Sequence, residues 1–291
     1  MSWLKLYRII RPYIVVGGLL GYILGVLLAM KAGASFQFPM VALGYLVVFF
    51  GDLSTHFSND YYDKEIDGAQ VRKLFSGVNV LVKNPQLASL AIYISILLAF
   101  ASVILAFTLM LIGASVLVVL IASGAVFLGW LYSAPPIRLC SRGLGEISIA
   151  LGVGFGIPAF GYIITNGRLD SGYLPLMIPL FLYGLVLSIS LGLPDINFDA
   201  RVGKNTLTSQ LGSFWSSMFI IALCVISSGI MWLEGLGVVA SLLPLAASFV
   251  NLLAVLNEYE WLGYKVQIGS LFGFLCLLII EFASTSSGLF T

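Results

Sequence analysis

Nine long apolar stretches constrain the fold of this chain more than any other feature of its sequence. A helix needs about 20 mainly apolar residues to cross the hydrocarbon core of a bilayer. The predicted spans are residues 12–31, 38–58, 86–107, 111–132, 143–165, 173–194, 211–232, 236–256 and 266–285. Charged residues make up 9% of the chain, whereas a soluble domain has roughly 25%. The sequence therefore predicts an all-α, polytopic membrane protein that forms one integral-membrane domain over residues 1–291.

The distribution of basic residues predicts the orientation of these helices. With nine spans, the N-terminus shares one side of the membrane with the loops that follow spans two, four, six and eight. That side receives twelve basic residues: Lys5, Arg8, Arg11, Lys64, Arg72, Lys73, Lys83, Arg138, Arg142, Arg201, Lys204 and Lys265. The other side receives only Lys31 and Arg168. Since basic loops favour the cytoplasm, we expect a multi-pass protein of the cell membrane whose N-terminus is cytoplasmic and whose first span is retained.

Two groups of acidic residues lie at the ends of spans on this basic side. The first group is Asn59, Asp60, Asp63 and Asp67, and the second is Asp195, Asn197 and Asp199. The first group continues a polar helical stripe that begins at Asp52 and His56, because steps of three and four residues return to one face of a helix. The second group follows Pro194, a residue that can interrupt span six. Carboxylates beside hydrocarbon are unfavourable, so in this chain they indicate a function.

The chemistry of the two groups favours a metal and diphosphate site. Facing carboxylates repel one another unless cations lie between them, and Mg2+ often links a few carboxylates to the phosphates of a substrate. Such an ion assists the departure of pyrophosphate from an allylic carbon. Simpler interpretations are a solvated helix end for the first group, a capped helix start for the second, and an interior hydrogen-bonded residue for His56. The nearby basic residues either contact the diphosphate or only reflect topology.

Two further features are compatible with such a site. Glycines are frequent in spans one and five, where they either allow close helix packing or leave room for a hydrophobic tail. These glycines are Gly17, Gly18, Gly21, Gly25, Gly152, Gly154, Gly156 and Gly161. The segment from Tyr132 to Glu146 contains two prolines and two arginines, and it is either a rigid connection or a cover over the site. The three cysteines have no spacing typical of a zinc site or a disulfide framework.

These motifs resemble those of the UbiA superfamily of intramembrane prenyltransferases. The first family motif, NDxxDxxxD, is matched at every fixed position by residues 59–67. The second, DxxxD followed by a GK-TL stretch, is matched by residues 195–199 and 203–207. The linker YSAPPIRLCSRGLGE is similar to that of the 1,4-dihydroxy-2-naphthoate, or menaquinone, branch. It differs from the tyrosine-to-lysine spacing of the hydroxybenzoate branch, since the first basic residue after Tyr132 is Arg138.

The resemblance implies a specific architecture and site. It implies nine helices around a central cavity, built as two four-helix repeats plus one helix, with a cytoplasmic cap and two Mg2+ ions that bridge the diphosphate. The implied metal and diphosphate residues are Asn59, Asp60, Asp63, Asp67, Asp195 and Asp199. The implied diphosphate contacts are Arg72 and Lys204, and Tyr132 and Arg138 are implied near the reacting centre.

The expected function is therefore Mg2+-dependent transfer of a prenyl group from a prenyl diphosphate to an aromatic acceptor, with 1,4-dihydroxy-2-naphthoate as the expected acceptor in quinone biosynthesis. Alternative acceptors are a glyceryl phosphate, a hydroxybenzoate or a porphyrin-like pigment. A cation-coupled transporter is the rival from another class, but its carboxylates would lie near the middle of the membrane. We expect no nucleic-acid partner and no obligate protein partner.

Overall fold

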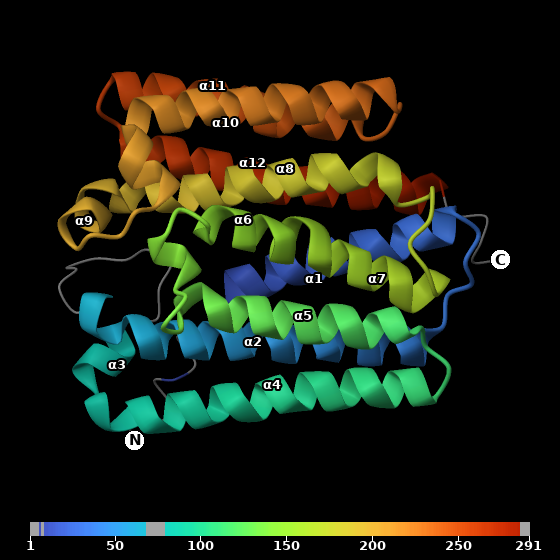
Figure 1. Cartoon of the computed structure of the whole chain (residues 1–291). Helices are drawn as coiled ribbons and strands as arrows, with labels where there is room; N and C mark the ends of the chain where they lie inside the picture. Colours follow the sequence, from blue (N-terminus) through green and yellow to red (C-terminus); the bar gives the residue numbers. More distant parts are fainter. Residues whose placement is uncertain (1–5, 7–8, 68–78, 286–291) are drawn as a thin grey trace.

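The computed structural model describes residues 6, 9–67 and 79–285, and within them nine helical segments are long and apolar enough to cross a membrane. Seven of these spans each consist of one long helix, and two are composite (Figure 1). The first four spans are α1 (Pro12–Lys31), α2 (Phe38–Asp67), α4 (Ala88–Leu111) and α5 (Val116–Ser133), with the short α3 (Asn79–Lys83) before α4. The fifth joins α6 (Gly145–Ile149), a π-helical segment (Ala150–Gly156) and α7 (Ile157–Asn166). The sixth joins α8 (Leu174–Gly192), a 3-10 turn (Leu193–Asp195) and α9 (Ile196–Arg201), and the last three are α10 (Leu207–Leu233), α11 (Val238–Leu256) and α12 (Glu260–Thr285).

The nine predicted spans are confirmed, and the largest differences are at their ends. The helix predicted for residues 38–58 continues to Asp67, because the polar stripe of the first acidic group remains helical. The last helix begins at Glu260, before the predicted residue 266. The turn between α4 and α5 covers only residues 112–115, and Ser115 caps α5 by accepting the Leu117 N–H at 3.4 Å.

Six of the nine spans enclose a central space. α1 packs against α7 and α12, α12 packs against α8, and α2 packs against α5 and α7. α4 lies outside α2 and α5 at one edge of the bundle, and α10 and α11 lie at the opposite edge (Figure 1). Lipid-facing apolar side chains are expected in a membrane, and α4 shows them clearly. Its exposed residues Tyr93, Leu97, Phe100 and Ile104 recur every three or four positions along one face.

The two halves of the chain share part of their packing. α2 packs along α4 in the first half, and α8 packs along α10 in the second, which is the correspondence expected of four-helix repeats. The halves differ in the second neighbour of these helices, since α2 also packs against α5 whereas α8 also packs against the ninth helix, α12. The ninth helix thereby closes the ring between α8 and α1.

Glycines of spans one and five are found both at close helix contacts and on the wall of the central cavity. A Cβ on Gly25 would lie 1.9 Å from the carbonyl oxygen of Pro158, and one on Gly161 would lie 2.3 Å from that of Tyr22. These two glycines are therefore required for the close contact between α1 and α7. Others in the same helices, Gly17, Gly152 and Gly156, line the central cavity instead.

Candidate active site

A cavity of 460 Å³ brings the two acidic groups together within the helical ring. Asn59, Asp60 and Asp63 reach it from α2. Asp195 and Asp199 reach it from the opposite wall, at the break between α8 and α9. Away from these carboxylates the wall is mainly apolar, formed by residues such as Val47, Ile121, Ala122, Phe160 and Leu271. The cavity therefore has a charged end and a hydrophobic body.

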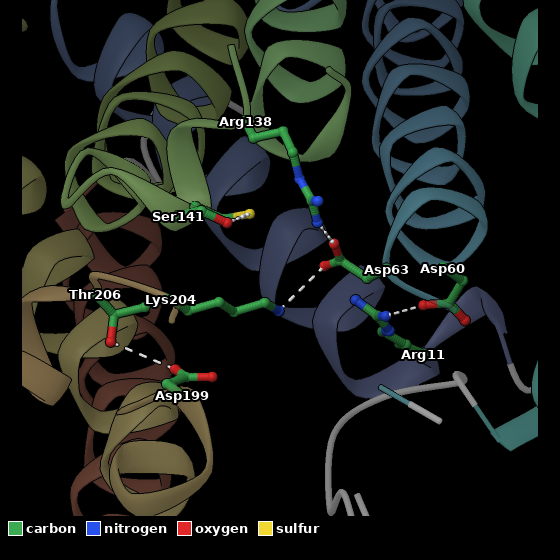
Figure 2. Close-up of polar contacts among 9 residues, drawn as sticks. Arg11, Asp60, Asp63, Arg138, Ser141, Asp199, Lys204 and Thr206 are labelled. Carbon is green, nitrogen blue, oxygen red and sulfur yellow. Dashed lines mark hydrogen bonds and ion pairs between the residues drawn. The ribbon is translucent and has the colours of Figure 1, made fainter. Parts of the chain in front are cut away.

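The carboxylates of α2 are paired with cations from distant parts of the chain. Asp60 is fully buried, and its Oδ1 accepts a hydrogen bond from the guanidinium of Arg11. Arg138 donates through Nη2 to Oδ1 of Asp63 at 2.9 Å, and Lys204 Nζ lies 3.6 Å from Oδ2 of the same side chain (Figure 2). Three separate segments therefore place positive charge on two neighbouring aspartates.

The second acidic group is positioned by a break in span six. α8 ends at Gly192, and the 3-10 turn that contains Pro194 leads into α9. Asp199 is buried, and its Oδ2 accepts the Thr206 hydroxyl at 3.4 Å. The chain then turns at Gly203, whose positive φ of 71° suits glycine. This turn returns the Lys204 N–H to the Asp199 carbonyl at 2.9 Å and directs the Lys204 side chain towards Asp63.

The linker between α5 and α6 lies at the same end of the cavity. Its Ser141 carbonyl accepts the Asn205 N–H at 3.4 Å, so the linker contacts the loop that carries Lys204. Cys140, in this linker, is buried and lines the cavity, and burial raises the pKa of its thiol. The thiol therefore stays protonated at neutral pH, which disfavours it as a nucleophile or metal ligand.

Two cavity residues were not among the predicted site residues. Arg11 counted only towards the topology, because nothing in the sequence places residue 11 beside residue 60. Glu146 was noted only as part of the linker. It is buried, its Oε1 accepts the Leu207 N–H at 2.8 Å, and its Oε2 has no hydrogen-bond partner among the described residues. The sequence signal that could have identified Glu146 is the rarity of acidic residues, since the chain has only thirteen.

Comparison with known proteins identifies the family to which this chain belongs. The UbiA prenyltransferase family model matches residues 19–281. The chain belongs to the UbiA prenyltransferase family. It is thus an integral-membrane prenyltransferase, and its helices have the fold of solved UbiA homologues. No curated protein gives a significant sequence match.

Three solved structures illustrate this similarity. A UbiA homologue from Archaeoglobus fulgidus bound to DMAPP and Mg2+ is 19% identical over 98% of this chain and 96% of that one, with a TM-score of 0.65. The apo structure of a UbiA homologue from Aeropyrum pernix K1 is 14% identical over 92% and 98%, with a TM-score of 0.69. A digeranylgeranylglyceryl phosphate synthase is 16% identical over 98% of both chains, with a TM-score of 0.65. At these identities the likeness establishes the fold.

The remaining predicted residues of this UbiA-family chain fall into three classes. Asp67 is the last residue of α2, but its side chain lies outside the described part, as do Arg72 and Lys73. Tyr132 lines the cavity. His56 donates from Nδ1 to the Ile10 carbonyl at 3.0 Å, and its Nε2 lies 3.4 Å from Asp52, so both ring nitrogens have a partner. His56 is thus the interior hydrogen-bonded residue of the simpler interpretation.

The donor set of the cavity suits a divalent cation that shares its ligands with a substrate. Among the described residues, no three His, Cys, Asp or Glu side chains converge on one ion. Among the described residues that line the cavity, two are cationic, Arg11 and Lys204, and Arg138 adds a third cation through its contact with Asp63. Six lining residues are carboxylates: Asp52, Asp60, Asp63, Glu146, Asp195 and Asp199. The Oδ1 of Asn59 is buried with no hydrogen-bond partner in the described structure. Oxygen donors with excess negative charge fit Mg2+, which usually completes its coordination with water and substrate phosphates.

Proposed function

We propose that this protein transfers a prenyl group from a prenyl diphosphate to an aromatic acceptor, with Mg2+ as the cofactor. The observation that carries the proposal is the cavity itself, in which carboxylates from α2 and α9 face one another beside an apolar body. A diphosphate is anionic and would be repelled by this wall without added cations. A prenyl tail is as apolar as lipid and matches the remainder of the cavity.

The residues divide into those that hold metal and those that hold diphosphate. The proposed metal ligands are Asn59, Asp60, Asp63, Asp67, Asp195 and Asp199. The proposed diphosphate contacts are Arg72, Arg138 and Lys204, and we place Tyr132 near the reacting carbon. Bound Mg2+, for which we expect two ions, would neutralise the diphosphate and lower the barrier to breaking its bond to the allylic carbon.

The chain then has three tasks during the reaction. Without ligand, Arg138 and Lys204 both neutralise Asp63. When Asp63 binds a metal cation instead, both basic side chains lie where they can contact the diphosphate oxygens. The apolar walls contributed by α5 and α12 hold the tail and exclude water, which would otherwise capture the allylic cation. The linker and the loop 203–206 contact one another at the charged end and help to cover it.

Among aromatic acceptors we propose 1,4-dihydroxy-2-naphthoate, which would place the enzyme in menaquinone biosynthesis. The support is the linker sequence from Tyr132 to Glu146, which is similar to that branch. The structural likeness to a digeranylgeranylglyceryl phosphate synthase favours a glyceryl phosphate as the second candidate. A transporter is less compatible, since the acidic groups lie at the ends of their helices rather than midway along them.

An acceptor panel tests the proposal directly. Purified protein in detergent or nanodiscs would receive geranyl, farnesyl or geranylgeranyl diphosphate with each candidate acceptor, and mass spectrometry would detect the prenylated product. We expect product with the dihydroxynaphthoate, loss of product in EDTA, and recovery when Mg2+ is restored. Product only with a glyceryl phosphate would favour the second candidate, and no transfer to any acceptor would contradict the proposed function.

We also propose that the charged end of the cavity faces the cytoplasm, as the basic residues predict. Single cysteines introduced by Val202→Cys and Arg168→Cys would lie in loops at opposite ends of the bundle. In intact cells a membrane-impermeant maleimide should label position 168, and it should label position 202 only after the membrane is permeabilised. The reverse pattern would contradict the orientation.

A further inference from the structure

One buried carboxylate in the cavity belongs to neither acidic motif. Glu146 begins span five beside the linker, lines the cavity and is only 6% exposed. One of its oxygens, Oε1, is held by the Leu207 N–H at the start of α10. The other, Oε2, is buried without a hydrogen-bond partner among the described residues. Leaving a buried acceptor unsatisfied is unfavourable, so such an atom on a cavity wall points to a partner supplied by a ligand.

Glu146 also lies beside the proposed reacting centre. A Cβ on the adjacent Gly145 would lie 3.3 Å from Cε2 of Tyr132, so the backbone here is pressed against the tyrosine ring. Tyr132, Asp63 and Glu146 all line the same cavity. The tyrosine therefore stands near both the α2 carboxylates, where the diphosphate is expected, and the unsatisfied oxygen of Glu146.

A second glutamate shows what a purely structural role requires. Glu281, on α12, accepts the Gly237 N–H through Oε1 at 3.0 Å at the start of α11, just as Glu146 accepts the Leu207 N–H at the start of α10. Glu281 is not part of the cavity wall. Capping a helix start uses one carboxylate oxygen in each case, but Glu146 differs in lining the cavity and in having a second oxygen with no hydrogen-bond partner among the described residues.

We propose that Glu146 is the catalytic base of the prenyl transfer and that the acceptor is a hydroxyarene whose O–H donates to Oε2. This inference rests on the proposed function and names the group that recognises the acceptor. As the ring carbon attacks the allylic carbon, a C–C bond forms and the C–O bond to diphosphate breaks, with its electron pair leaving on the diphosphate. The hydroxyl proton passes to Oε2, and the ring becomes a neutral ketone. The ring then loses its C–H proton to solvent and recovers the oxygen proton from Glu146, which returns to its carboxylate form.

The substitution Glu146→Gln separates this role from capping. The amide oxygen of glutamine can still accept the Leu207 N–H, but its NH2 group cannot take a proton. We expect kcat with a hydroxynaphthoate acceptor to fall by about 10²–10⁴-fold, the usual contribution of a general base, while KM for the prenyl diphosphate stays within about threefold. Glu281→Gln is the matched control, since it makes the same chemical change at the other helix start, and it should retain wild-type kcat.

Methyl ethers of the acceptor give a second readout that a structural role would not alter. The wild-type enzyme should strongly prefer the free hydroxyl over the methyl ether, and Glu146→Gln should lose most of this preference. Glu146→Asp keeps a carboxylate, so it should retain the hydroxyl preference and more activity than Glu146→Gln. It also keeps the inference testable if the glutamine variant does not fold.

Three results would overturn the inference. The first is wild-type kcat in a folded Glu146→Gln enzyme, and the second is an unchanged hydroxyl preference in that variant. The third is loss of the hydroxyl preference in folded Glu146→Asp. Each result leaves the proposed function intact, because wild-type transfer to the hydroxyarene would already have been measured. Absence of any wild-type transfer would instead contradict the proposed function, and the inference with it.

Discussion

The two ends of the helical bundle hold their carboxylates in different ways. At the cavity end, Asp60 and Asp63 pair with Arg11 and Arg138, which are 49 and 75 residues away in the chain. At the opposite end, the carboxylate of Asp170 is satisfied within eight residues. Its partners are the Tyr162 hydroxyl, the Asn166 amide at 2.8 Å, the Gly172 N–H at 3.0 Å and Arg168 at 3.3 Å.

This difference separates a structural carboxylate from one that can exchange its partners. The partners of Asp170 all belong to one helix end and its loop, so the folded segment alone fixes them. The cations on Asp60 and Asp63 come from separate segments that meet beside a cavity. When cations and an anionic ligand enter that cavity, both sides of each ion pair gain an alternative partner. We therefore propose that the cavity end binds ligand and that the other end contributes to stability.

Asp63→Asn should give the largest effect, because it removes the carboxylate that two cations now share. We expect prenyl transfer to fall by about 10³-fold or more, the range seen when a key electrostatic group is removed from an active site. Transfer would be measured as labelled product, and size-exclusion chromatography would check that the variant is folded. Asp170→Asn is the control from the other end and should keep wild-type activity. Substantial transfer by folded Asp63→Asn would contradict the assignment of the two ends.

Lys204→Gln should have an intermediate effect. Lys204 is buried and lies 3.6 Å from Asp63, so a bound diphosphate would find it as a desolvated cation. A hydrogen bond to a charged group contributes about 1.5–3 kcal/mol, so KM for the donor should rise by about 10–100-fold. Lys31 at the other end lies over the Phe282 ring, at 4.6 Å from its centroid, and Lys31→Gln should leave this KM unchanged. Equal effects of the two substitutions would remove the distinction between the ends.

The fold was predictable from the sequence because a bilayer imposes simple requirements. A span must be apolar over its full length, and this requirement alone located all nine helices. The boundaries were less predictable where a helix leaves the membrane. α2 continues for nine residues, most of them polar or charged, beyond the predicted end at residue 58, because helical hydrogen bonding does not require apolar side chains.

The two acidic motifs of the site were predictable, and the residues that other segments bring to the cavity were less so. Steps of three and four residues placed Asn59, Asp60 and Asp63 on one face of a helix, and that arrangement depends on local geometry alone. The partners Arg11 and Glu146 depend on which segments meet around the cavity, and a single sequence does not specify those tertiary contacts. From the sequence, Arg11 is only one of the basic residues that indicate the cytoplasmic side, and its contact with Asp60 is known only from the structure.

The apolar body of the cavity leads to a prediction about donor length. Ala122 lines the cavity ten residues before Tyr132 on α5, a separation of about 15 Å along the helix. With C–C bonds of about 1.5 Å, one extended isoprene unit spans about 5 Å, so Ala122 should lie beside the third unit of a tail whose head is at Tyr132. Ala122→Phe should lower kcat/KM for geranylgeranyl diphosphate by about tenfold or more, since overpacking is costly, and should affect geranyl diphosphate little.

The matched control for this prediction is Leu120→Phe, which adds an aromatic ring on the same helix at a position that is 61% exposed and does not line the cavity. Leu120→Phe should leave the ratio of kcat/KM for geranylgeranyl diphosphate to kcat/KM for geranyl diphosphate unchanged. Equal losses for both donors in Ala122→Phe would show that the tail does not pass this position.

The smallest effect is expected at the far end, where Asp170→Asn should alter stability and leave catalysis unchanged. Hydrogen bonds from Tyr162, Asn166 and Gly172 hold the pKa of Asp170 well below its usual value of 3.8. A carboxyl whose pKa is lower in the folded state stabilises that state fully above its unfolded pKa, and this stabilisation declines as pH falls towards the folded value. The variant should therefore melt at a lower temperature than the wild type at pH 7, and the gap should narrow below about pH 3.8. Detergent-solubilised protein followed by intrinsic fluorescence would measure both curves, and a gap that widens in acid would contradict the structural role of Asp170.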